Sequence, residues 1–285
     1  MKRLLVLKSL FLSLLLSLGL GFARPVLEVS FDAGAEEALE QIEAALAEQG
    51  FSLEQTLDVG LTIRNRGSDF MPYFLAVVST DDAMEIAIAE DPRLMVFLPV
   101  SMVVFEKQEG RTTVAIVDHS RLLSFFSLSP EAELGLSESF EQLYAALANL
   151  GRVRRAPGGL TTEPPYTTAT LAEESVEDVM FFFASAYQSQ NMNQVGQMQF
   201  GDAMQEWYCN ASYAEAIFTI EPTLGTGAPC RIFAYPSEEG ITIGVANPNY
   251  ARSAFPKAFA SDDAMMSLDK ILGLNRSVFV EMGVE

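Results

Sequence analysis

The sequence contains very few of the residue types on which enzyme active sites depend. It has one histidine, two cysteines and one tryptophan among 285 residues. A catalytic triad built on serine or cysteine would have to use His119. That histidine follows Asp118 in the first half of the chain, whereas both cysteines lie in the second half. We interpret His119 as an exposed residue at the end of a strand, and we expect no catalytic residues and a protein that is not an enzyme.

Positive charge is also scarce. The formal net charge is −20, and the lysines beyond the first residues are Lys107, Lys257 and Lys270. Nucleic acids and anionic membranes bind through clustered lysine and arginine, so this composition excludes them as partners. One basic cluster, Arg152, Arg154 and Arg155, lies in a segment that we interpret as a solvated loop.

Long apolar runs are missing beyond the N-terminus. Lys2, Arg3 and Lys8 precede an apolar stretch from Leu10 to Leu20, and the small residue Ala23 follows it. This pattern is typical of a secretion signal, and we expect cleavage after Ala23. The stretch is shorter than the roughly 20 residues that a spanning helix needs. We therefore expect an exported protein, periplasmic or extracellular, without a membrane span in the mature chain.

What the sequence does contain is an internal repeat. Residues 78–125 align without a gap on residues 208–255 at an offset of 130. Pro92 falls on Pro222 and Pro99 on Pro229. Residues 28–50 align on residues 168–190 at an offset of 140. Because proline and glycine fix turns, this matched spacing indicates one fold written twice. The second copy is shorter between the two blocks, which fits a change in a hairpin loop.

Each copy has the same predicted order: a strand, an amphipathic helix, two strands, a second helix, two strands and a trailing helix. In the first copy we expect these elements at 26–31, 35–49, 52–64, 73–78, 81–90, 96–105, 112–117 and 137–150. In the second copy we expect them at 166–171, 175–189, 195–200, 204–209, 212–220, 230–235, 240–246 and 261–272. The predicted organisation is a signal peptide (1–23), a first unit (24–150), a linker rich in proline and glycine (151–165) and a second unit (166–285).

The second copy resembles a known family. Tyr208-Cys209-Asn210, Glu221-Pro222 and Ala228-Pro229-Cys230-Arg231 are similar to the signature of the domain of unknown function 302 family. The first copy keeps Asp91-Pro92 and Leu98-Pro99. The resemblance implies an α+β fold of the TATA-binding-protein-like class, with helices on one face of a curved antiparallel sheet. It also implies a monomer in which the two units form a fused pair. The family has no settled activity, so the resemblance indicates a fold and not a function.

Cys209 and Cys230 are the residues most open to a chemical role. Ser79 and Val100 occupy the matching positions of the first copy. In an exported protein an even cysteine count favours a disulfide, although buried free thiols or a reactive thiol pair remain alternatives. Weaker binding candidates are their neighbours Asn210, Arg231, Trp207 and Tyr208. Met192, Met198 and Met204 could ligate copper, but methionine is a common core residue. We expect no metal and no cofactor.

These observations favour an exported, non-enzymatic binding protein. Its partner, a small ligand or a protein, would lie in the groove between the two units. One alternative is a thiol-dependent redox or sulfur-handling protein that uses Cys209 and Cys230. Another alternative is a structural or interaction protein.

Overall fold

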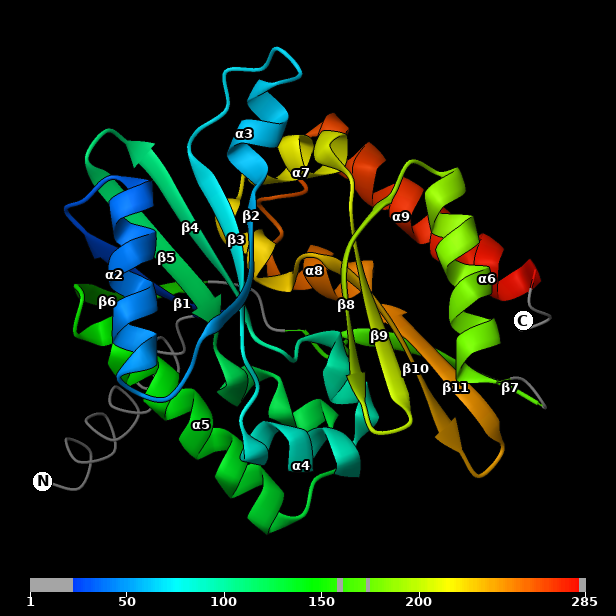
Figure 1. The fold of residues 1–285 in the computed structure, drawn as a ribbon. Helices are drawn as coiled ribbons and strands as arrows, with labels where there is room; N and C mark the ends of the chain where they lie inside the picture. Colours follow the sequence, from blue (N-terminus) through cyan, green and yellow to red (C-terminus); the bar gives the residue numbers. More distant parts are fainter. Residues whose placement is uncertain (1–22, 158–160, 173–174, 282–285) are drawn as a thin grey trace, which may run out of the picture.

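Two antiparallel sheets form the centre of the molecule (Figure 1). The computed structural model describes residues 23–157, 161–172 and 175–281. The predicted signal peptide therefore lies almost wholly outside the described residues. The first sheet has the order β2-β3-β4-β5-β1-β6. Its strands are β1 (Ala23–Phe31), β2 (Leu53–Asp58), β3 (Tyr73–Val78), β4 (Ser101–Gln108), β5 (Arg111–Val117) and β6 (Arg152–Pro157).

The second sheet repeats the arrangement of the first, with the order β7-β11-β10-β9-β8. Its strands are β7 (Tyr166–Leu171), β8 (Asn193–Phe200), β9 (Ala203–Cys209), β10 (Cys230–Ser237) and β11 (Gly240–Ala246). Since β7 to β11 take the places of β1 to β5, the two copies share one topology. The prediction of a mixed α+β fold with two antiparallel sheets is confirmed.

Most of the helices also correspond between the copies, and α3 is the exception. The first copy has α2 (Ala35–Ala47), α3 (Val59–Arg64), α4 (Asp82–Glu90), η1 (Pro92–Val96), η2 (His119–Arg121), η3 (Leu123–Phe125) and α5 (Pro130–Ala148). The second copy has α6 (Val176–Ser189), α7 (Ala211–Phe218), η4 (Pro222–Gly227), α8 (Pro248–Ala254) and α9 (Asp262–Glu281). Helix α4 ends before Asp91-Pro92 and α7 ends before Glu221-Pro222, as the acid–proline pairs predict.

Some predicted boundaries are wrong. The strand expected over 52–64 stops at Asp58, whose carboxylate accepts a hydrogen bond from the Leu61 backbone at 2.6 Å and caps α3. Helix α3 and the loop after it contain the residues that the second copy lacks. The trailing helix α5 begins at Pro130 and not at residue 137, because Ser129 caps it through the Ala132 backbone at 3.2 Å.

Part of the predicted linker is a strand. Residues 152–157 form β6, which pairs antiparallel with β1 at the edge of the first sheet. The arginines expected in a solvated loop therefore lie on a strand. Arg154 contacts Glu28 of β1 at 2.5 Å, and Arg155 contacts Asp118 at 3.3 Å. These ion pairs give the basic cluster a structural role at this edge.

The central strands of each sheet are buried on both faces. On β4, Met102 and Val104 belong to the core that the first copy forms with its own helices, whereas Val103 and Phe105 face α7 and α8 of the second copy. On β10, Ile232 packs under α6, whereas Phe233 packs into the core of the first copy. Because neighbouring residues of a strand point to opposite faces, each copy covers one face of the other copy's sheet.

Contacts made in both directions hold the two copies together. The Tyr73 hydroxyl, on β3, donates to the Pro222 carbonyl of η4 at 2.7 Å. In return the Gln205 side-chain amide, on β9, donates to the carbonyls of Met95 and Leu98, at and beside η1. Gly225 permits the close approach, since a Cβ there would lie 2.0 Å from the Tyr73 hydroxyl. The two copies therefore pack into one body and are not separate domains joined by a linker.

His119 is not an exposed residue, as the sequence analysis supposed. It is 7% exposed and stacks on Phe140 with ring centroids 4.7 Å apart. Its Nδ1 lies 3.0 Å from the Tyr144 hydroxyl, which donates to the Val117 carbonyl. Helix α5 covers the strand end that the sequence analysis placed at the surface. None of the helices described here is long and apolar enough to cross a bilayer.

Candidate functional site

Strands β9 and β10 deliver the candidate residues to two different environments. Gln205, Trp207 and Arg231 leave the sheet on the face that packs against the first copy. Tyr208 and Ile232 leave it on the opposite face, under α6. The alternation of strand side chains sets this division. The site is therefore best described as a polar contact between the copies and a cavity at the strand ends.

Arg231 forms the centre of the contact between the copies. Its guanidinium donates to the carbonyls of Met95 and Pro99 at 3.4 and 2.5 Å, and to the Ser101 hydroxyl at 2.7 Å. The side chain is 2% exposed, and burial lowers the pKa of Arg231 to about 9. Within the described part of the chain, no carboxylate forms an ion pair with it. Neutral acceptors of the first copy thus hold this buried cation.

Trp207 supports the same contact. Its indole nitrogen donates to the Gln205 side-chain oxygen at 2.7 Å, and the Arg231 guanidinium lies 6.0 Å from its ring centre. The Gln205 amide nitrogen in turn donates to the carbonyls of Met95 and Leu98, at and beside η1. This arrangement assigns Trp207 and Arg231 mainly to joining the copies.

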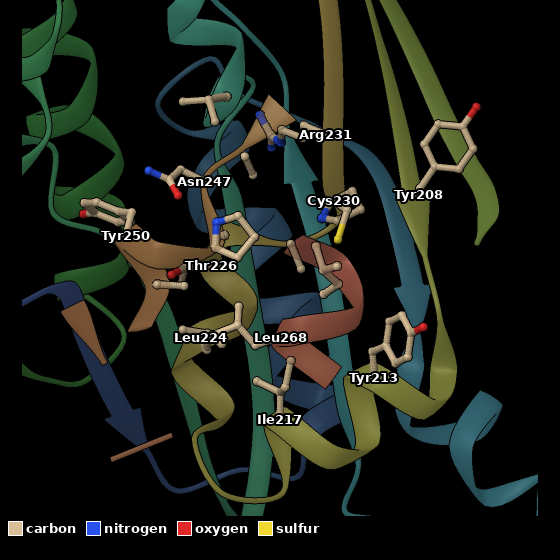
Figure 2. A pocket seen from close by; sticks show the side chains of 18 of the residues that line it. Tyr208, Tyr213, Ile217, Leu224, Thr226, Cys230, Arg231, Asn247, Tyr250 and Leu268 are labelled. Carbon is tan, nitrogen blue, oxygen red and sulfur yellow. The ribbon is translucent and has the colours of Figure 1, made fainter. Parts of the chain in front are cut away.

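A cavity of about 190 Å³ lies at the ends of β9, β10 and β11, between η4, α7, α8 and α9 (Figure 2). The second copy supplies most of its wall. The first copy adds Val96, Phe97, Val117 and Leu122. The cavity thus borders the junction of the copies, but it is not the central groove that the sequence analysis expected.

The cavity wall is mainly apolar. Its characteristic residues are Ile217, Phe218, Leu224, Phe255, Leu268 and Ile271. Figure 2 shows the hydroxyl groups of Tyr208 and Tyr213 pointing away from the space bounded by Ile217, Leu224 and Leu268. The aromatic rings thus contribute apolar surface, and the site suits an apolar molecule better than a polar one.

The asparagines around the cavity are already hydrogen-bonded. Asn210 caps α7 through the backbone of Ser212 and Tyr213 at 2.9 and 3.2 Å, and it donates to the Asn191 carbonyl at 3.1 Å. Asn275 accepts a hydrogen bond from the Tyr187 hydroxyl at 2.5 Å. Because these amides already have protein partners, they shape the wall and leave little polar capacity for a ligand.

Cys209 and Cys230 both line the cavity, yet both are free thiols and do not form the expected disulfide. The strand register explains this difference. Cys230 lies opposite Tyr208, so Cys209 is offset by one residue, and the two side chains start from opposite faces of the sheet. Accordingly, Cys209 lies near Tyr73 of the first copy, whereas Cys230 lies near Tyr187 and Tyr213.

Burial also keeps the thiols protonated. It raises the pKa of Cys209 to about 11, and burial together with the nearby Cys209 raises the pKa of Cys230 to about 12. Nucleophilic and redox cysteines have lowered pKa values, since the thiolate is the reactive form. The environment of these cysteines therefore opposes thiolate chemistry at neutral pH. Figure 2 shows the Cys230 sulfur directed toward the apolar part of the cavity.

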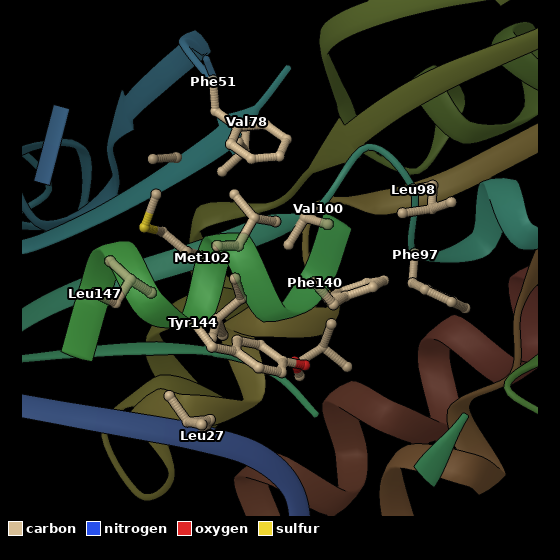
Figure 3. Packing of buried hydrophobic residues seen from close by; sticks show 14 of the residues in the cluster. Leu27, Phe51, Val78, Phe97, Leu98, Val100, Met102, Phe140, Tyr144 and Leu147 are labelled. Carbon is tan, nitrogen blue, oxygen red and sulfur yellow. The ribbon is translucent and has the colours of Figure 1, made fainter. Parts of the chain in front are cut away.

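The position of the first copy that matches Gly227 holds a large buried side chain (Figure 3). At the offset of 130 residues, Phe97 corresponds to Gly227. Phe97 is 6% exposed and packs against Phe126 and Phe140, with ring centroids 5.5 and 6.3 Å away. At Gly227 an added Cβ would meet no atom within 4 Å. One large-to-small difference thus accompanies the open cavity.

Sequence reasoning found part of this site. Tyr208, Cys209, Asn210, Cys230 and Arg231 line the cavity, whereas Trp207 lies at the contact between the copies. It missed the apolar wall and Gly227. The repeat alignment could have indicated Gly227, since it aligns this glycine with Phe97 of the first copy. Among the described residues, no cluster of three or more histidine, cysteine or acidic side chains could hold a metal ion.

Comparison with known proteins identifies the repeated unit. The family model described as "Domain of unknown function DUF302" matches residues 27–150 and 161–273. A search of the curated proteins found no match. Among solved structures, an uncharacterized conserved DUF302 protein from Bacillus stearothermophilus is 21% identical, with a TM-score of 0.40, and the match covers 44% of this chain and 98% of that one.

Two longer structures also match at low similarity. The di-domain ARO/CYC StfQ from the steffimycin biosynthetic pathway is 11% identical with a TM-score of 0.25, covering 90% of this chain and 96% of that one. An unknown protein from Galdieria sulphuraria is 10% identical with a TM-score of 0.17, covering 91% and 93%. The family match, in contrast, extends over both copies of the repeat. This chain belongs to the DUF302 family and carries two copies of its domain.

Proposed function

We propose that the protein is a non-enzymatic binding protein that holds one small apolar molecule in the cavity of its second copy. The observation that carries this proposal is the difference between the copies. Phe97 packs into the core of the first copy and also lines the cavity, whereas its counterpart Gly227 leaves open space on the cavity wall. A large side chain is therefore compatible with the fold at this position, and its absence at the exposed Gly227 leaves this part of the cavity wall open.

The size of the cavity limits the ligand. An engineered cavity of about 150 Å³ lined by leucine, isoleucine and phenylalanine binds benzene. The present cavity of about 190 Å³ is slightly larger and has a similar lining. It therefore fits a molecule with one aromatic or alicyclic ring and a few further atoms. Raised thiol pKa values oppose the redox alternative, as described above.

Gly227→Phe tests this function directly. Indole, toluene and cyclohexanol would serve as probes, with binding followed by ligand-observed saturation-transfer NMR and by titration calorimetry. We expect the wild-type protein to bind at least one probe, and Gly227→Phe to bind it at least about ten-fold more weakly, because the phenyl ring would occupy the cavity. Gly227→Ala is the matched control, since a methyl group fits there without contact.

Two results would contradict the proposal. The wild-type protein could bind none of the three probes, or Gly227→Phe could bind them as well as the wild type does. Far-UV circular dichroism would show whether each variant keeps the fold.

We also propose that the protein is exported. The basic start, the apolar stretch from Leu10 to Leu20 and the small residue Ala23 support this proposal. Intact mass measurement on the protein produced by a secreting cell tests it. A mature chain that begins at Arg24 is the expected result, and a chain that keeps the leader and stays inside the cell would contradict it.

A further inference from the structure

Strand β7 forms an outer edge of the second sheet. It pairs on one side with β11, from Ile241 opposite Leu171 to Ala246 opposite Tyr166. On its other side, no strand among the described residues pairs with it. Thr167, Thr168 and Thr170 are exposed along this edge. An edge strand without a neighbour presents unpaired backbone N–H and C=O groups that can accept another strand.

The first copy shows what this edge can accommodate. There the equivalent strand, β1, has a further antiparallel neighbour, β6, with Val29 opposite Val153 and Glu28 opposite Arg154. The helices of this fold therefore leave room for one more strand at that edge. In the second copy the same position is open among the described residues.

The edge is also held in place. Tyr166, at the start of β7, accepts a hydrogen bond from the Arg93 guanidinium at 2.9 Å and donates to the Phe125 carbonyl at 3.0 Å. The hydroxyl groups of Thr170 and Thr242 lie 3.0 Å apart. Because both the second sheet and the first copy hold β7 in place, little conformational entropy is lost in ordering β7 when another strand pairs with it.

Charge indicates the kind of partner. In the first copy Glu28 of β1 meets Arg154 of β6, but the residue that corresponds to Glu28 in β7 is Thr168. Residues 164–171 contain no charged side chain. A charged peptide would therefore gain no ion pair at this edge. The uncharged β7 of a second molecule fits this edge. When two molecules are related by a two-fold axis, the threonine-rich β7 of one pairs with the same strand of the other.

We propose that two molecules of this protein associate through β7, with the two β7 strands antiparallel and Thr168 opposite its own copy, so that the second sheets join into one continuous sheet. Each full-length chain carries a formal net charge of −20, and the molecules repel each other elsewhere. Salt screens that repulsion, so the dimer strengthens as ionic strength rises.

Analytical ultracentrifugation of the full chain tests the proposal through its mass. We expect a concentration-dependent dimer that is favoured in about 1 M salt over about 0.1 M salt. Thr168→Glu places like charges opposite each other across the two-fold axis and should weaken association at least about ten-fold. Thr162→Glu is the matched control, because it adds the same charge at an exposed position outside β7.

A mixture of variants makes the test specific. Thr168→Glu and Thr168→Arg should each be monomeric alone and should form a heterodimer when mixed, as Glu28 and Arg154 pair in the first copy. A wild-type protein that stays monomeric in both salt concentrations would overturn the proposal and support the monomer expected from the sequence. A wild-type dimer that Thr168→Glu leaves unchanged would also overturn it, because the interface would then lie elsewhere.

Discussion

Phe97 and Gly227 occupy matching positions of the two copies, and substituting alanine at each should have opposite effects. In Phe97→Ala the ring leaves a buried site in which it contacts Phe126 and Phe140 at centroid distances of 5.5 and 6.3 Å. In Gly227→Ala the new methyl group enters open space. The two variants therefore place the same residue at equivalent points of one fold, with only the surroundings different.

The magnitudes follow from burial. Phe97 is 6% exposed, and truncating a buried phenylalanine to alanine costs about 3–5 kcal/mol through lost transfer energy and the cavity left behind. Two aromatic contacts, each worth about 0.5–1.5 kcal/mol beyond the area buried, place the expected loss near about 4 kcal/mol. For Gly227→Ala we expect no loss and a gain of up to about 1 kcal/mol, because alanine reduces the freedom of the unfolded chain.

Urea denaturation followed by far-UV circular dichroism measures both values. We expect a single transition, since the two copies share a core that Val103, Phe105 and Phe233 help to form. Phe97→Ala should lower the free energy of unfolding by about 4 kcal/mol. If both alanine variants changed stability equally, or if Phe97→Ala cost less than about 1 kcal/mol, the idea that Phe97 is a tightly packed core residue at this position would be refuted.

Three further predictions concern titrating and charged groups. His119 is the one histidine of the chain, and burial lowers its pKa below 6.5, so its NMR titration should have a midpoint below 6.5. The free energy of unfolding should fall as the pH drops below 6.5, because the unfolded chain binds that proton first. A midpoint above 6.5 would contradict this prediction. Cys230→Val introduces the residue type that the first copy has at Val100. The wild type should lose stability as the pH rises above 9, because the unfolded thiol ionises near 9.0 and the folded one at about 12, and the variant should lose less. Identical pH profiles for wild type and variant would argue against a buried protonated thiol. Arg231→Lys should lower the free energy of unfolding by about 2 kcal/mol, because a lysine ammonium cannot reach Met95, Pro99 and Ser101 together; an unchanged urea midpoint would show that the contact contributes little.

Local signals in the sequence predicted the elements of the fold well. Acid–proline pairs marked the ends of α4 and α7, and Gly110 and Gly240, both with positive φ, marked the turns between paired strands. These features depend on one or two residues and their backbone preferences. The repeat then carried each assignment from one copy to the other.

Features that depend on contacts between distant residues could not be predicted in the same way. The cysteine pair shows this limit, because the expected disulfide failed on a register offset of one residue between β9 and β10. The environment of His119 depends on α5, which packs over it from 25 residues away. Likewise β6 looks like a linker by composition, and it becomes a strand because β1 offers it an edge.

The contact of Arg231 with Ser101 explains how a fused pair can become asymmetric. The two residues occupy matching positions, so their contact lies near the pseudo-two-fold axis, where a residue meets its own counterpart. In a symmetric dimer an arginine at this position would face a second arginine, and two buried cations would repel each other. With both copies in one chain, the two positions vary separately. Ser101 and the backbone carbonyls of the first copy can then accept hydrogen bonds from the Arg231 guanidinium of the second copy. In the same way residue 227 can remain glycine while its counterpart Phe97 packs in the core of the first copy.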